Sequence, residues 1–153
     1  MSVLATGSYT VRSLKDKSIV GRFIQEDRSL QPKPIFALPA DFPQADNLRF
    51  EKQDDGTYRI TARGAAVTHR RDLLFADIID IEEEGSNNKL WKLMRQFRRG
   101  ENVHTIVLAN EQEKGWSVPA PIGDWPFGPQ VAVTSLTVGP NYDEAELFII
   151  SPA

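Results

Sequence analysis

The sequence predicts an all-β domain, and two observations carry that prediction. A short phrase recurs three times in 153 residues, as GSYTV from Gly7, GTYRI from Gly56 and NVHTI from Asn102. Each copy starts at a turn-forming residue and then places an aromatic residue or His and a β-branched residue at alternating positions, as a strand does after a turn. Frequent Pro and Gly, ten of each, leave little room for a long helix. Three such repeats, about 50 residues each, predict a β-trefoil with twelve strands and pseudo-three-fold symmetry.

One domain spanning 1–153 is expected, since the chain is long enough for a sizeable core but short for two domains. The repeats are placed at approximately 7–55, 56–101 and 102–153. The chain has no cysteine, so no disulfides are expected within or between the repeats.

Four strands are expected in each repeat. The recurring phrase marks the first strand of each repeat, and the Pro-rich segments 25–34, 38–45 and 119–129, in the first and third repeats, are interpreted as loops. The last strand of each repeat carries two bulky apolar residues on one face, which we interpret as barrel core. These pairs are Leu48 with Phe50, Trp91 with Leu93, and Phe148 with Ile150. The expected strands are 9–13, 18–24, 35–38, 47–53, 58–63, 65–69, 75–82, 90–96, 104–109, 115–118, 130–138 and 146–151.

One of these strands has a helical alternative. Within 90–99, the apolar residues Leu90, Leu93, Met94 and Phe97 also fit helical spacing. The place of this segment in the repeat favours a strand.

Composition excludes several classes of function. The net charge of −3 argues against general nucleic-acid binding, which favours a basic surface. No segment reaches the roughly 18 apolar residues of a membrane-spanning helix, and the N-terminal residues do not have the pattern of a signal peptide. A cytoplasmic monomer that does not bind nucleic acid or membrane is therefore expected.

Signals for an enzyme are weak. The motifs HExxH and GxSxG and a Gly-rich phosphate loop are absent, and we expect no cofactor, no metal and no catalytic residue. His104 takes the Tyr position of its repeat and is expected in the core or a turn. The acidic triplet 82–84 is interpreted as a solvated turn, and the pairs Arg70-Arg71 and Arg98-Arg99 as solubilising charge.

A sugar-binding domain is an alternative for this fold. Trp116 and Trp125 are the side chains that would stack on a ligand, although Trp125 fits a plug at the barrel floor equally well. The repeated Gln-x-Trp signature of ricin-like lectins is absent from all three repeats.

The segment 25–34, QEDRSLQPKP, is the most informative loop. It places Arg28 near the middle of the connection between the second and third strands. Pro32 and Pro34 restrict the backbone there and extend the residues before them. A stiff, extended loop that presents Arg is the shape that a trypsin-like protease binds as substrate, because its specificity pocket carries a buried Asp. Lys33 is a poorer candidate because Pro34 follows it.

With the opening GSYTVRS, the phrase DDGTYRI and the lack of cysteine, the chain resembles the mushroom β-trefoil protease inhibitors. That family comprises the mycocypins, which inhibit cysteine proteases, and the mycospins, which inhibit serine proteases. The similarity covers the whole chain and is greatest to a trypsin inhibitor of the mycospin group.

The resemblance implies a protease-binding loop between the second and third strands, acting on trypsin-like serine proteases. By that resemblance Arg28 enters the specificity pocket and Ser29 follows the scissile bond. Glu26 and Asp27 would lie on the acyl side, and Leu30, Gln31 and Pro32 on the leaving-group side.

Mycocypin-type inhibition of cysteine proteases is a further alternative, but the loops that carry it fit less well. The segment 14–17, LKDK, lacks the Gly pair of the mycocypin loop that enters a papain-like cleft, and 63–66, RGAA, lacks their legumain-inhibiting Asn. The loop 53–56, QDDG, is acidic where plant Kunitz trefoil inhibitors carry their reactive Arg.

Overall fold

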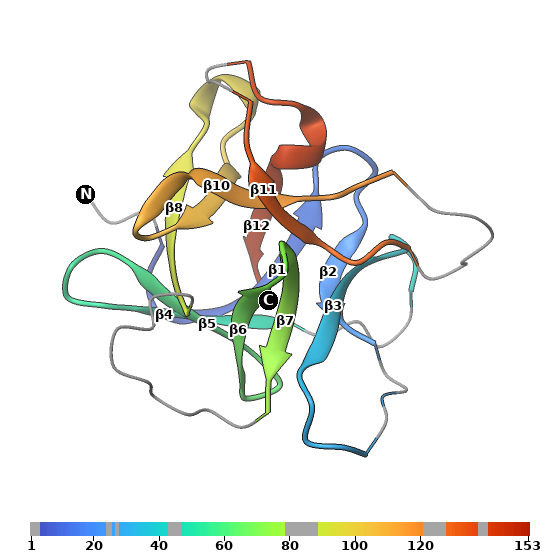
Figure 1. Cartoon of the computed structure of the whole chain (residues 1–153). Coiled ribbons are helices and arrows are strands. Elements are labelled where there is room, and N and C mark those ends of the chain that lie inside the picture. Colours follow the sequence, from blue (N-terminus) through green and yellow to red (C-terminus); the bar gives the residue numbers. More distant parts are fainter. Residues whose placement is uncertain are drawn as a thin grey trace.

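The computed structural model describes residues 4–23, 26, 28–42, 47–78, 89–120, 128–137 and 141–153. Within these residues the chain is built of twelve β-strands and two short 3₁₀ helices (Figure 1). The strands are β1 Gly7–Ser13, β2 Ile19–Arg22, β3 Lys33–Leu38, β4 Leu48–Lys52, β5 Tyr58–Ala62, β6 Ala65–Arg70, β7 Leu73–Asp77, β8 Leu90–Arg95, β9 Val103–Leu108, β10 Glu111–Ser117, β11 Ala132–Ser135 and β12 Phe148–Pro152. The helices are η1 Phe97–Arg99 and η2 Glu144–Glu146. The all-β class is therefore confirmed.

Six of the strands pair in a closed ring, in the order β1, β4, β5, β8, β9, β12 and back to β1. All of these pairings are antiparallel. The other six form the hairpins β2–β3, β6–β7 and β10–β11. The hairpins meet through pairings of β7 with β3 and with β11, and through a bridge from Phe36 to Gln130.

The predicted core residues of the ring strands are all buried. Their alternation is visible in β5, where buried Tyr58, Ile60 and Ala62 alternate with partly exposed residues. Each large apolar side chain removed from water in this way stabilises the fold by about 1.5–3 kcal/mol. The predicted pairs are Leu48 with Phe50, Trp91 with Leu93, and Phe148 with Ile150, each at most 4% exposed.

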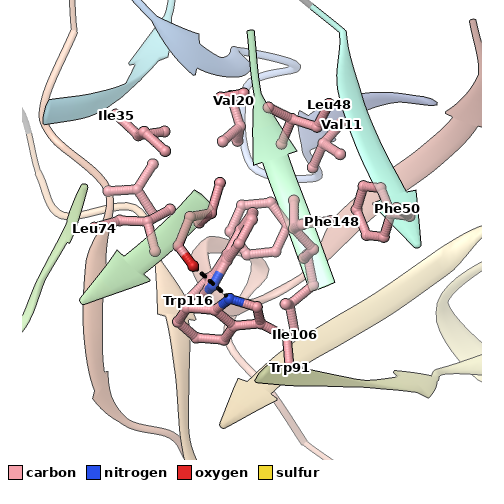
Figure 2. Packing of buried hydrophobic residues seen from close by; sticks show 14 of the residues in the cluster. Val11, Val20, Ile35, Leu48, Phe50, Leu74, Trp91, Ile106, Trp116 and Phe148 are labelled. Carbon is pink, nitrogen blue, oxygen red and sulfur yellow. Dashed lines mark hydrogen bonds between the residues drawn. The ribbon is translucent and has the colours of Figure 1, made fainter. Parts of the chain in front are cut away.

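Aromatic rings fill the centre of the core (Figure 2). Trp91 and Trp116 meet edge to face with 5.5 Å between ring centroids, and Phe148 meets Trp116 in the same way at 6.0 Å. Trp91 donates a hydrogen bond from Nε1 to the Val67 carbonyl at 3.0 Å. The sequence hypothesis that Trp116 stacks on a sugar is therefore wrong, because this ring has no exposed surface.

The corresponding position of the three recurring phrases is buried in every copy. Tyr9, Tyr58 and His104 are 8%, 1% and 2% exposed. The hydroxyls of Tyr9 and Tyr58 donate to the carbonyls of Ala5 and Leu4, so each buried ring satisfies its polar atom with the N-terminal segment. His104 lies in β9, as the core interpretation predicted.

Several strand bounds differ from the prediction. Glu146 was expected in the last strand but belongs to η2, because its side chain accepts from the Asp143 backbone N–H in a capping box. Pro34 was expected in a loop but lies in β3, opposite Phe75. β10 begins at Glu111, four residues before the predicted start, because the polar residues at its beginning hide the strand pattern. Segment 90–99 forms a strand up to Arg95, which confirms the strand over the helical alternative, and η1 follows it.

Some predictions fall outside the described residues. They include Ile24 in the strand expected over 18–24, the end of the strand expected over 75–82, Val138 in the strand expected over 130–138, the acidic triplet 82–84, and Trp125. Of the helices in the described residues, none has the length and apolar character needed to cross a membrane.

Candidate functional site

The connection between β2 and β3 carries the candidate site. It runs from the end of β2 at Arg22 to the start of β3 at Lys33, and residues 28–31 are all exposed. Arg28 therefore projects from an exposed part of the loop, as the sequence predicted. Leu30, two residues on, leaves 64% of its surface in water. Asp27 and Gln25 lie outside the described residues.

A largely buried ion pair holds the part of this loop that precedes Arg28. Glu26 accepts two hydrogen bonds from the Arg22 guanidinium, from Nε at 3.0 Å and from a terminal nitrogen at 2.5 Å. The two side chains are only 13% and 8% exposed. The other terminal nitrogen of Arg22 donates to the Ala62 carbonyl at 3.0 Å, which connects the pair to the end of β5. Bidentate geometry of this kind fixes direction as well as distance.

The β5–β6 turn adds a second anchor on the same side. Arg63 donates to the Phe23 carbonyl at 2.8 Å and lies 3.6 Å from a carboxylate oxygen of Glu26. Only Arg63 and Gly64 separate β5 from β6, and both have positive φ, 47° and 81°. Such a two-residue turn fixes the direction in which Arg63 leaves the sheet. The ring strands and this loop are thus joined by three charged groups.

Lys33 holds the part of the loop that follows Arg28. This side chain is 4% exposed, and its ammonium donates to the Ser29 hydroxyl at 3.2 Å. The same hydroxyl accepts from the Gln31 backbone N–H at 3.3 Å, so the loop folds back on itself just after Arg28. Pro32 is half-buried next to the strand. Pro34 stiffens the start of β3 rather than the loop itself.

Lys33 and Arg22 were missed as site residues in the sequence. Each is a charged residue in a segment that is otherwise apolar and buried, which was the available signal. A buried charge is retained only when a partner satisfies it. In both cases the partner, Ser29 or Glu26, belongs to the loop that carries Arg28.

The described part of the loop presents an exposed cation, Arg28. Among the described residues, no group of three or more His, Asp or Glu has the geometry to hold a metal ion. Burial lowers the pKa of the His104 imidazole from its ordinary value, and burial likewise lowers the pKa of His69. Both histidines favour the neutral form, and neither lies on the loop. The geometry is that of an exposed loop held at both ends.

The basic pairs do not gather at this site in one cluster. Arg70 forms an ion pair with Asp77 at 3.0 Å, and Arg71 is exposed in the β6–β7 turn. Arg98 and Arg99 lie in η1, on the connection from β8 to β9. Figure 1 shows that connection, in yellow, at the opposite side of the molecule from the start of β3.

Comparison with known proteins places the whole chain in one group. Residues 1–152 match the family model described as peptidase inhibitor I66. The chain is similar to a serine protease inhibitor of Lentinula edodes, with 34% identity over 139 residues that cover 90% of this chain and 87% of that protein. It is also similar in structure to a proteinase inhibitor from Coprinopsis cinerea, with a TM-score of 0.83 and 35% identity over 99% of this chain and 100% of that one.

A similarity in fold alone extends further. The ricin B-like lectin of Macrolepiota procera matches with a TM-score of 0.68 and 13% identity, covering 100% of both chains. At that identity only the fold is shared.

Proposed function

Because the chain belongs to the peptidase inhibitor I66 family, we propose that it inhibits trypsin-like serine proteases by inserting the β2–β3 loop into the active-site cleft. Its relatives are protease inhibitors, not enzymes, and its partner is a protease. One observation carries the proposal: the exposed Arg28 lies between two residues that bond to buried cations, Glu26 to Arg22 on one side and Ser29 to Lys33 on the other.

In this proposal the loop binds as a substrate does. Arg28 enters the specificity pocket, where a buried Asp neutralises its charge. Glu26 and Asp27 lie on the acyl side of the scissile bond. Ser29, Leu30, Gln31 and Pro32 occupy the leaving-group side, and the exposed Leu30 offers an apolar contact there.

Rigidity then separates an inhibitor from an ordinary substrate. A loop that is already ordered loses little conformational entropy on binding, so more of the contact energy appears as affinity. Glu26 and Ser29 lie on either side of Arg28, and each is bonded to a buried side chain of the sheet. After cleavage of the bond from Arg28 to Ser29, these anchors keep the new ends close together, and religation competes with hydrolysis.

We also propose that the fold is a β-trefoil of three repeats, at approximately 7–55, 56–101 and 102–153, in one domain. The recurrence of pairings supports this proposal. The first strand of each repeat pairs with the fourth, as β1 with β4, β5 with β8 and β9 with β12. The second and third strands of each repeat form a hairpin.

The experiment is to measure inhibition of trypsin by Arg28→Ala and Arg28→Glu. Loss of a central charged anchor typically costs 2–4 kcal/mol, so the inhibition constant is expected to rise by a factor of about 30–1,000 for Ala and more for Glu. Arg98→Ala is the matched control, because it removes one exposed Arg from η1, on the β8–β9 connection that Figure 1 shows away from the start of β3. Circular dichroism checks that every variant is folded.

If Arg28→Glu inhibits trypsin as well as the unmodified protein does, another loop is responsible. Inhibition of papain that survives this change would favour the cysteine-protease alternative.

A further inference from the structure

A surface groove lies directly beside the leaving-group side of the loop. It has a volume of about 650 Å³, and the loop contributes Gln31 and Pro32 to its wall. The β6–β7 hairpin supplies the rest of the lining, Arg70, Arg71, Leu73 and Phe75. The groove is therefore continuous with residues that the proposed function places against the protease.

The charged side chains in the described lining of the groove are both cations, although the protein as a whole is negatively charged. Its described lining contains two Arg and no carboxylate, whereas the whole chain has a net charge of −3. The charge of Arg70 is partly balanced by Asp77, which lies outside the lining at 3.0 Å. Arg71 is exposed, so its charge faces solvent at the groove. Apolar side chains, Leu73 and Phe75, lie beside these charges and are half-buried.

Arg71 is poorly suited to its backbone position. Only Arg71 and Asp72 separate β6 from β7, and their φ angles are 52° and 64°. A two-residue turn with both φ angles positive favours Asn, Asp or Gly, and an Arg in this region is strained by its Cβ. Asp72 suits the turn and Arg71 does not. The side chain at 71 thus works against the turn while adding a cation to the groove.

We propose that this groove binds an acidic surface segment of the target serine protease, next to the active-site cleft, when Arg28 occupies the specificity pocket. This inference rests on the proposed function. Its occupant follows from charge complementarity with Arg70 and Arg71 and from continuity with Gln31 and Pro32. An exposed charge at the edge of an interface acts mainly on the association rate and on its salt dependence.

The test is Arg71→Gly, which has opposite expected effects on stability and on inhibition. Gly suits a positive φ, so the melting temperature should stay the same or rise. Association with trypsin, followed by stopped-flow at low and at physiological salt, should slow by about 3–10-fold at low salt and depend less on salt. Arg98→Ala, which removes the same charge from the opposite side, should have a much smaller effect. Arg71→Lys should restore most of the rate.

An association rate for Arg71→Gly equal to that of Arg98→Ala would overturn the groove proposal, and so would failure of Arg71→Lys to restore the rate. Arg28→Ala, measured alongside, separates this failure from failure of the proposed function. If Arg28→Ala abolishes inhibition while Arg71→Gly changes nothing, only the groove is refuted. If Arg28→Ala inhibits normally, the loop assignment fails, and the groove proposal fails with it.

Discussion

Removing the carboxylate of Glu26 tests how the loop is held. Glu26→Ala leaves the Arg22 guanidinium, 8% exposed, with the hydrogen bond to the Ala62 carbonyl. Removing one partner of a fully buried ion pair typically costs 3–5 kcal/mol, and for this partly exposed pair we expect a fall of about 2–3 kcal/mol in the free energy of unfolding.

The effect on inhibition follows from the freedom that the loop gains. Ordering one residue of backbone costs about 1–2 kcal/mol, and loss of the Glu26 anchor releases one or two residues next to Arg28. A cost of about 2 kcal/mol on binding corresponds to an inhibition constant raised about 30-fold. The Glu26→Ala variant should also be cleaved faster after Arg28, because the two chain ends formed by cleavage separate more easily.

The assay combines denaturant unfolding, the inhibition constant for trypsin and the rate of cleavage. Glu113→Ala is the matched control, since Glu113 is an exposed carboxylate on β10 and its removal changes the net charge equally. If Glu26→Ala lowers stability as expected but inhibits with an unchanged constant and resists cleavage, the ion pair is structural only. The account of the anchored loop would then be refuted on its acyl side.

Two further predictions concern the core. Trp91→Phe should lower the free energy of unfolding by about 1 kcal/mol more than Trp116→Phe does. The reason is that Trp91 donates a hydrogen bond to the Val67 carbonyl, whereas the buried Trp116 nitrogen has no partner among the described residues. Urea unfolding of both variants measures this difference, and equal losses of unfolding free energy would contradict it. Burial lowers the pKa of His104, so the unfolded chain binds more protons, and stability should fall as the pH drops below about 6.5. His104→Tyr should reduce the difference in unfolding free energy between about pH 7.5 and pH 5.5, and an undiminished difference would assign the effect to other groups.

The strand pattern was predictable because it depends on local alternation. The bulky residues that end each repeat, such as Trp91 and Leu93, are buried as their spacing indicated. The predicted strand bounds were wrong where polar residues occupy a strand, as at Glu111 in β10. They were also wrong where a helix cap takes the place of the strand, as at Glu146. Sequence alternation does not report hydrogen bonds made by side chains to the backbone.

The exposure of Arg28 was also predictable, because polar residues and prolines surround it in the sequence. Its anchors were not, because they depend on contacts between distant segments. Arg22 reaches the Ala62 carbonyl, 40 positions away in the sequence, and Arg63 reaches the Phe23 carbonyl across the same span. The prediction that Trp116 stacks on a sugar was wrong for the same reason. Trp116 is buried against Trp91 of β8 and Phe148 of β12, which are distant in the sequence.

We propose that the β2–β3 loop binds a trypsin-like protease as a substrate does and is cleaved only slowly. Mass spectrometry of the inhibitor after hours with trypsin at neutral pH tests this most directly. We expect most of the inhibitor to stay intact, with slow cleavage confined to the bond between Arg28 and Ser29. Inhibition should be retained throughout. Rapid and complete cleavage at that bond with loss of inhibition would make the loop an ordinary substrate and would contradict the account.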